Sequence, residues 1–160
     1  MKQLWAPWRM DYILGEKSHT CIFCHTASVK RSKKKLLLYS GNHSLVMLNK
    51  YPYTNCHLLV APQKHTDSLS ALSRKASQDL FSTLQKSVSL LKEAVMPEGF
   101  NIGMNLGRIA GAGIEDHLHF HIVPRWCGDT NFMPIVAESM VMPEHLNKAY
   151  ERLAPYFKKL

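Results

Sequence analysis

The sequence has no long hydrophobic run and few residues of the kinds that mark fibrous or disordered chains. Its longest apolar stretches, such as 58–62 and 135–137, fall far short of the ~20 residues that a membrane-spanning helix requires. Glycine and proline number eight each and hydrophobic residues make up 46%, which excludes low-complexity, collagen-like and disordered chains. The N-terminal segment lacks the apolar core and the cleavage site of a signal peptide. We therefore expect a cytoplasmic protein without a membrane partner.

Acidic side chains are also scarce. Asp and Glu number 12 against 20 Lys and Arg, which gives a formal net charge of +8 and makes anionic partners plausible. Much of the excess lies in the run 30–35, which we interpret as a solvated loop that steers anions as a side effect. A length of 160 residues fits one domain over 1–160, with an irregular segment over 1–35 and a core over 36–160.

Cysteine is limited to four residues, and a cytosol keeps thiols reduced, so metal binding or packing comes before disulfides. Cys21 and Cys24 have the spacing of a metal knuckle. The residues alone leave this pair open between a metal site and two buried thiols. Cys127 has no obvious partner, and we expect it to pack in the interior.

Hydrophobic patterning predicts an α+β fold, with an antiparallel sheet of about five strands, one long amphipathic helix and a C-terminal helix. Apolar residues at three- and four-residue steps predict the long helix over 73–95. The C-terminal helix is expected over 143–156. Short runs between turn residues predict strands over 36–39, 44–48, 57–61, 101–105 and 117–123, with Pro124 closing the last.

Histidine, in contrast, is abundant, and three of the nine lie within five residues, at His117, His119 and His121. They alternate with apolar residues, and because strand side chains alternate between faces, the three imidazoles are expected on one face. Such a row suits either a metal ion or chemistry on phosphorus. The glycine-rich loop 107–113 ahead of the row could cradle an anion through backbone N–H groups, although its simplest interpretation is a hairpin connection.

The segment 117–123 resembles the His-φ-His-φ-His-φ-φ signature of the histidine triad (HIT) superfamily of nucleotide hydrolases and transferases. The segments 48–53 and 57–62, with His65 beyond, agree with it. The stretch 116–134 and the opening 4–9 are similar to the bacterial branch of diadenosine tetraphosphate (Ap4A) phosphorylases, so the resemblance covers nearly the whole chain.

This resemblance implies phosphorolysis of Ap4A to ADP and ATP in a homodimer, with inorganic phosphate as the acceptor and no organic cofactor. It implies that His119 is the nucleophile that carries the nucleotide, while His121 and His57 bind the phosphate oxygens and orient the triad. It implies a structural zinc site, and the ligands would be Cys21, Cys24, His65 and His117. The substrate-binding residues would be Asn49 at the ribose, Asn105 on the phosphate side, Gly111, Gly113 and Trp126.

Two departures from the family pattern bear on the reaction. Gly113 and Ile114 stand where many members carry Gln and Ser, so two side-chain donors near the leaving group are missing. A glycine there leaves room for phosphate as the attacking group. Cys56 stands where relatives usually carry Gly.

Four alternatives stay open at this stage. Two are enzymes that share the nucleotidyl-histidine step, a Hint-like nucleoside phosphoramidase and a dinucleoside polyphosphate hydrolase. A third is a catalytic metal site built on the triad itself. The last is a basic zinc-knuckle module that binds nucleic acid through the lysine run with Tyr51, Tyr53 and Trp126, which we disfavour because it leaves the triad unexplained.

Overall fold

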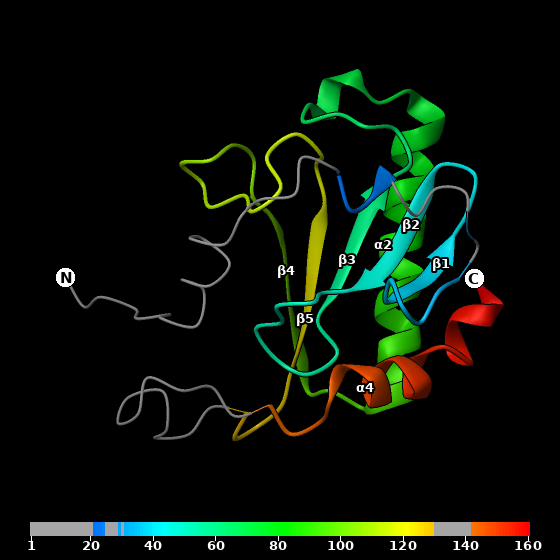
Figure 1. The fold of residues 1–160 in the computed structure, drawn as a ribbon, viewed down its shortest axis with the longest axis vertical. Helices are drawn as coiled ribbons and strands as arrows, with labels where there is room; N and C mark the ends of the chain where they lie inside the picture. The colour runs from blue at the N-terminus through cyan, green and yellow to red at the C-terminus, as the bar shows by residue number, and fades with distance from the viewer. Residues whose placement is uncertain (1–20, 25–28, 30, 130–141) are drawn as a thin grey trace.

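The computed structural model describes residues 21–24, 29, 31–129 and 142–160. The motif at 4–9, the end of the branch-specific stretch at 130–134 and Lys30 of the basic run lie outside the described residues. Five strands form one antiparallel sheet in the order β1-β2-β3-β5-β4 (Figure 1), which confirms the predicted α+β class. The elements are β1 (Leu37–Ser40), β2 (Ser44–Leu48), β3 (Leu58–Pro62), α2 (Arg74–Val95), β4 (Gly99–Met104), β5 (Phe120–Arg125) and α4 (Leu146–Leu153), with short 3₁₀ turns at Leu69–Ala71 and Tyr156–Lys159.

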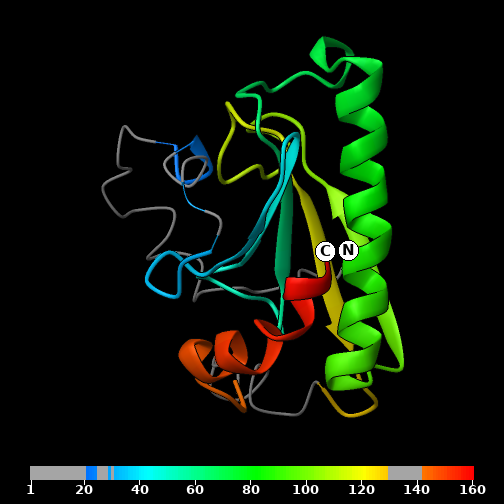
Figure 2. The same ribbon diagram turned by 90° about the vertical axis from the view of Figure 1, so that its right-hand side faces the viewer.

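The long helix α2 covers one face of the sheet (Figure 2). It begins where the Ser73 hydroxyl accepts a hydrogen bond from the N–H of Ala76, and it ends at Met96, whose φ of 45° is left-handed. Leu80, Leu84 and Leu91 lie on its buried side, as the three- and four-residue spacing predicts. They pack against a core that includes the strand residues Leu38, Val46, Leu48, Leu58, Val60 and Ile122.

The opposite face of the sheet has a second, smaller core. Residues 21–24 lie on this side (Figure 2), and Phe23 is completely buried there. Its neighbours in this core come from alternate strand positions and are Leu37, Leu45, Met47, Leu59 and Ala61. Residues 21–24 therefore cover part of the face that α2 leaves open.

Strand β5 differs from its predicted bounds at both ends. It begins at Phe120 rather than at His117, and it continues through Pro124 to Arg125. Pairing with β3 stops at Ile122, so at Pro124 the strand has a partner on one side only, where a residue without an N–H is tolerated. The expectation that Pro124 ends the strand is therefore wrong.

Helix α4 begins three residues later than predicted. The ring Nδ1 of His145 accepts a hydrogen bond from the N–H of Asn147 and so caps the helix at that point. Pro155 follows its C-terminal end. Among the described residues, no helix combines the length and the apolar character that crossing a membrane requires.

Candidate active site

The predicted histidine row lies on one face of the sheet, on the side opposite α2. Leu118 and Ile122, which alternate with the histidines, belong to the core under the helix. The ring of His121 lies 4.9 Å from that of His119 and 5.1 Å from that of His57, measured between ring centroids. His57, the residue before β3, reaches the row because β3 and β5 are neighbours, with Leu59 paired to His121.

Hydrogen bonds define which nitrogen of His57 and of His121 carries the proton. The backbone N–H of Tyr53 donates to Nδ1 of His57 over 3.1 Å, and the amide nitrogen of Asn49 lies 3.3 Å from the same atom. Nδ1 of His57 is therefore an acceptor, so its Nε2–H donates to Nδ1 of His121 over 2.9 Å. The remaining nitrogen of His121, Nε2, must then carry a proton.

In the ring of His119, the proton is on Nδ1 instead. Its Nδ1 lies 2.9 Å from the carbonyl oxygen of His117, to which only an N–H can donate. In the neutral ring Nε2 then holds a lone pair. His119 and His121 consequently place an unprotonated and a protonated nitrogen in neighbouring rings, which is the pairing that nucleophilic attack on a phosphoryl group needs.

Burial favours the neutral forms of His57 and His119. Burial, together with the charges that His121 and His119 could carry, lowers the pKa of His57 to about 3. Burial also lowers the pKa of His119, against an opposing contribution from its hydrogen bond to the His117 carbonyl. A neutral His119 at pH 7 is a competent nucleophile.

Asn49 lies beside the histidines, whereas Asn105, Gly111 and Gly113 lie in and beside the loop that follows β4, the strand next to β5. Asn49 is in contact with His57, as described above. Asn105 follows β4, whose last residue pairs with Phe120, and its amide donates to the carbonyl oxygen of Gly111 over 3.4 Å. Gly111 has a φ of 85°, which favours glycine, and Gly113 is half-buried two residues further on.

Trp126 lies elsewhere. It follows the far end of β5, five residues beyond His121, a span of roughly 16 Å along a strand. Its indole N–H donates to the carbonyl oxygen of Val95 at the end of α2, over 3.2 Å. The structure therefore does not bring Trp126 to the histidines of its own chain.

The four predicted metal ligands do meet. The ligand atoms of Cys21, Cys24, His65 and His117 all lie within 4.8 Å of one another. Nδ1 of His117 is 3.3 Å from Sγ of Cys21, 3.7 Å from Sγ of Cys24 and 3.3 Å from Nδ1 of His65. Tetrahedral zinc with bonds of ~2.0–2.3 Å holds its ligand atoms about 3.3–3.8 Å apart, so the set fits zinc.

His117 is oriented for such a role. Its Nε2 lies 2.8 Å from the carbonyl oxygen of Pro62 and donates to it, which leaves the lone pair on Nδ1 directed at the cysteines. The same residue offers its own carbonyl to His119. The four candidate metal ligands and the predicted nucleophile are thus joined through His117.

The other two cysteines differ in exposure. Cys127 is exposed, so the expectation that it packs in the interior is wrong; it lies in the turn after β5, where its N–H donates to Glu98. Cys56 is buried, and burial raises the pKa of its thiol to about 12. Its φ of 58° lies in the left-handed region, which favours glycine.

Phe23 is a residue of this site that was not predicted from the sequence. Its ring lies 4.9 Å from that of His117 and 5.2 Å from that of His119, again between centroids. Phe23 therefore covers both rings. The available signal was its place between the two cysteines, because a knuckle that binds His117 must bring Phe23 with it.

Comparison with known proteins agrees with this geometry. A family model described as HIT domain matches residues 30–127, and the chain belongs to this family. The AP-4-A phosphorylase of Mycobacterium tuberculosis is 34% identical over 163 positions, covering 96% of this chain and 83% of that protein. An adenosine 5'-monophosphoramidase of Schizosaccharomyces pombe is 34% identical over 106 positions, covering 66% and 74% of the two chains.

Solved structures agree as well. A hypothetical histidine triad nucleotide-binding protein from Sulfolobus tokodaii has a TM-score of 0.67 at 27% identity, covering 87% of this chain and 90% of its own. A zinc-bound histidine triad family protein from Mycobacterium smegmatis has a TM-score of 0.67 at 24% identity, covering 89% and 96%. The expected fold and the expectation of a histidine triad enzyme are confirmed.

Proposed function

We propose that this protein transfers the nucleotidyl group of Ap4A to inorganic phosphate, by way of a covalent intermediate on His119. The observation that carries the proposal is the neighbouring pair of rings, in which Nε2 of His119 holds a lone pair and Nε2 of His121 a proton. The similarity to an AP-4-A phosphorylase along 96% of the chain supports the choice of substrate.

In the first step, Nε2 of His119 attacks the α-phosphorus of Ap4A. The new N–P bond forms as the bond to the bridging oxygen breaks, and ATP leaves with that oxygen. The proton on Nδ1 stays in place, and the carbonyl of His117 stabilises the positive charge that the ring acquires. The Nε2–H of His121 donates to a phosphoryl oxygen and stabilises the charge that develops there.

In the second step, an oxygen of inorganic phosphate attacks the same phosphorus. The N–P bond breaks, its electron pair returns to Nε2 of His119, and ADP is released. We infer that the acceptor enters beside the half-buried Gly113 and the loop that begins at Asn105. Gly113 has no side chain to occupy that space, which supports phosphate as the acceptor.

His57 acts through His121 rather than on the substrate. Both of its ring nitrogens are already engaged, and its side chain is completely buried. We therefore assign it a positioning role, in which it fixes the ring of His121 and keeps the proton of that ring on Nε2. We assign Asn49, beside His57, to binding the ribose hydroxyls.

A structural zinc ion is part of the proposal. Cys21, Cys24, His65 and His117 would hold it, and the zinc-bound protein from M. smegmatis supports the assignment. With all four ligands from the protein, the ion would be structural, because it has no open position for a substrate. It would fasten the Phe23 segment over the sheet.

We also propose a homodimer built through β4. Among the described strands β4 pairs only with β5, so it forms an edge of the sheet. Its central residues Asn101, Ile102 and Gly103 are exposed. An exposed edge strand is a ready template for pairing with another chain, and a second copy would cover it. Light scattering should find a dimer, and an active monomer would contradict this part.

Product analysis tests the reaction. Ap4A is supplied with ¹⁸O-labelled phosphate, and separately with unlabelled phosphate in ¹⁸O-labelled water. The proposal predicts ADP and ATP, with the label from phosphate in the β-phosphate of ADP and none from water. If water supplies the oxygen and the product is AMP, the protein is a hydrolase. A preference for nucleoside phosphoramidates over Ap4A would instead favour the activity named for the S. pombe relative.

A further inference from the structure

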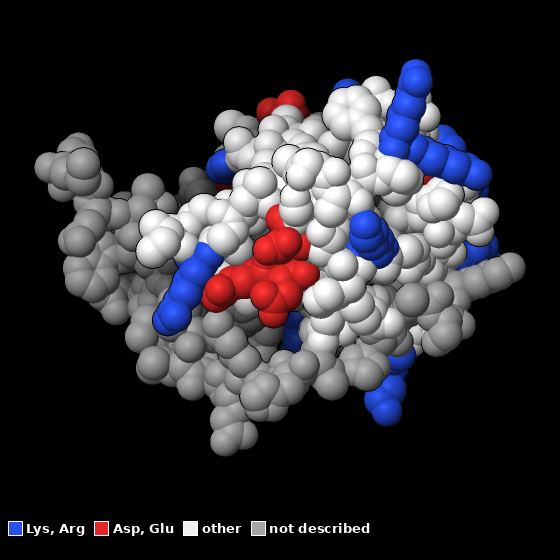
Figure 3. Space-filling view, turned by 90° about the horizontal axis from the view of Figure 1, so that it is seen from above, with Lys and Arg blue, Asp and Glu red and all other residues white. Residues whose placement is uncertain are grey.

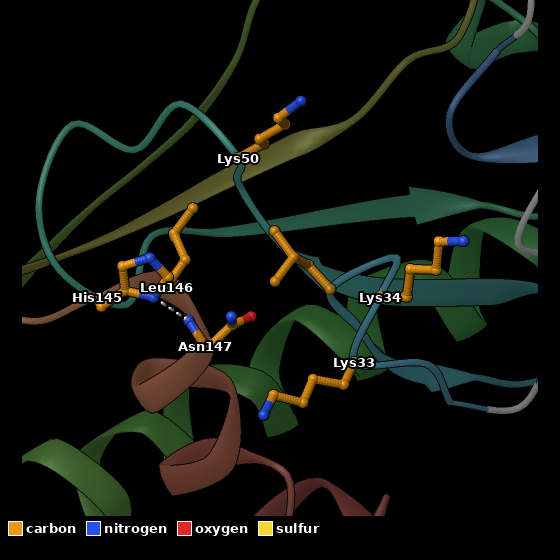
Figure 4. Close-up of a pocket in the computed structure, with 7 residues that line it drawn as sticks. Lys33, Lys34, Lys50, His145, Leu146 and Asn147 are labelled. Atoms are coloured by element: carbon orange, nitrogen blue, oxygen red, sulfur yellow. Dashed lines mark hydrogen bonds between the residues drawn. The ribbon is translucent and has the colours of Figure 1, made fainter.

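A hollow lined by basic residues lies outside the histidine site. It has a volume of about 520 Å³ and lies between the turn before β1, the loop after β2 and the first residues of α4 (Figure 4). The turn contributes Lys33, Lys34 and Leu36, the loop Lys50, and the helix region His145, Leu146 and Asn147. The structure thus brings together part of the basic run, which the sequence predicts to be a solvated loop.

The lysines of the hollow are only partly neutralised. The ammonium of Lys33 lies 2.6 Å from one carboxylate oxygen of Glu151, and the ammonium of Lys148 lies 3.6 Å from the other oxygen. Lys34 and Lys50 form no ion pair with any residue that the structure describes, and Lys50 lies 5.5 Å above the ring of Tyr51. The hollow therefore has net positive charge.

This charge is local. Figure 3 shows a group of acidic side chains together on another face of the molecule. The formal net charge of +8 is consequently not spread evenly over the surface. A diffusing anion is attracted to the places where lysines are not balanced, and the hollow is one of them.

Uncharged donors of the hollow add to the attraction. The N–H of Asn147 donates to Nδ1 of His145, the interaction drawn in Figure 4, so the proton of a neutral His145 is on Nε2. Leu146 and Asn147 are the first residues of α4, where the helix dipole favours negative charge. The ammonium groups point in different directions around the rim (Figure 4), and their flexible stems allow them to turn toward an anion.

The shape of the hollow decides which anion it suits. Sites for small ligands enclose roughly 300–1,000 Å³, and this hollow falls within that range. Leu36 and Leu146 provide apolar surface beside the charges. We propose that the hollow binds a compact polyphosphate anion, such as the phosphate chain of a nucleotide, at a site separate from the histidine triad. A nucleic acid strand would need a basic surface extended along its backbone rather than a single hollow.

Calorimetry with inorganic tripolyphosphate tests the proposal. The titration contains excess AMP, which competes for phosphate contacts at the triad. The variant replaces Lys34 and Lys50 by Gln, and the matched control replaces Lys75 and Lys86, two exposed lysines of α2, by Gln. Because all four side chains are exposed, equal unfolding temperatures are expected, and they are measured to verify folding.

We expect wild type and control to bind tripolyphosphate alike, and the Lys34→Gln/Lys50→Gln variant to bind about tenfold or more weakly. Affinity should fall as salt is added. An equal loss in both variants, or no binding to wild type, would overturn the proposal. The proposal would also be overturned if binding of a short single-stranded oligouridylate required Lys34 and Lys50 while binding of tripolyphosphate did not require them. None of these results depends on whether the triad transfers nucleotides.

Discussion

Replacing Phe23 by Ala tests how the N-terminal segment supports the histidine site. Phe23 is fully buried, packs in the smaller core and covers the rings of His117 and His119. Truncating a buried Phe to Ala typically costs about 3–5 kcal/mol of the free energy of unfolding. For a domain of this size, a loss of that magnitude lowers the melting temperature by about 6–20 °C.

Phe157 provides the matched control. It is also fully buried, but it lies in the core beneath α2, on the other side of the sheet from the histidines. Phe157→Ala should therefore lower stability by a similar amount without freeing the ring of His119. Both variants would be unfolded by heat to measure stability, and their turnover of Ap4A would be measured well below either melting temperature.

The two variants should separate in activity. Loss of Phe23 lets the ring of His119 turn away from its attacking position, and a misplacement of about 1 Å can cost on the order of a hundredfold in rate. We expect kcat to fall between about tenfold and a hundredfold in Phe23→Ala and to stay near wild type in Phe157→Ala. A Phe23→Ala protein that is destabilised yet fully active, or an equal loss of kcat in both variants, would refute this reasoning.

Three further predictions concern the histidines and cysteines. The purified protein should contain about one zinc per chain, and His65→Ala should lose it while His43→Ala keeps it; full zinc in both would contradict the site. Folding lowers the pKa of His57 to about 3, so the stability that neutral His57 contributes is complete above about pH 6.5 and declines as the pH falls toward 3. The urea concentration at the midpoint of unfolding should therefore depend less on pH over this interval in His57→Gln than in the wild type. An unchanged pH dependence would contradict this prediction. A thiol reagent should modify exposed Cys127 but not Cys56, whose burial raises its pKa to about 12; rapid modification of Cys56 in the folded protein would be the contrary result.

Much of the fold follows from local pattern. The alternation around His119 places imidazoles and core residues on opposite faces, and the 3.6-residue period of α2 identifies its buried side. Element ends were harder to predict, because they depend on neighbours in space. Pro124 stays within β5 since β3 no longer pairs there, and α4 begins at Leu146 because the His145 ring caps it.

The candidate site could be predicted only in part. The histidine row and the family resemblance predict its residue types. They do not predict which ring nitrogen carries each proton. Those positions depend on the carbonyls of His117 and Pro62 and on the N–H of Tyr53, which only the folded chain brings into place. The cover that Phe23 provides was missed, although its place between Cys21 and Cys24 was a signal for it.

Trapping the covalent intermediate tests the central claim most directly. Ap4A is mixed with the protein without phosphate, the reaction is stopped in alkali, where phosphoramidates persist, and the peptides are examined by mass spectrometry. We predict AMP attached to the peptide at His119, with no adduct and no turnover in His119→Ala, and a normal adduct in the control His43→Ala. An adduct on another residue, or near wild-type turnover by His119→Ala, would contradict the account.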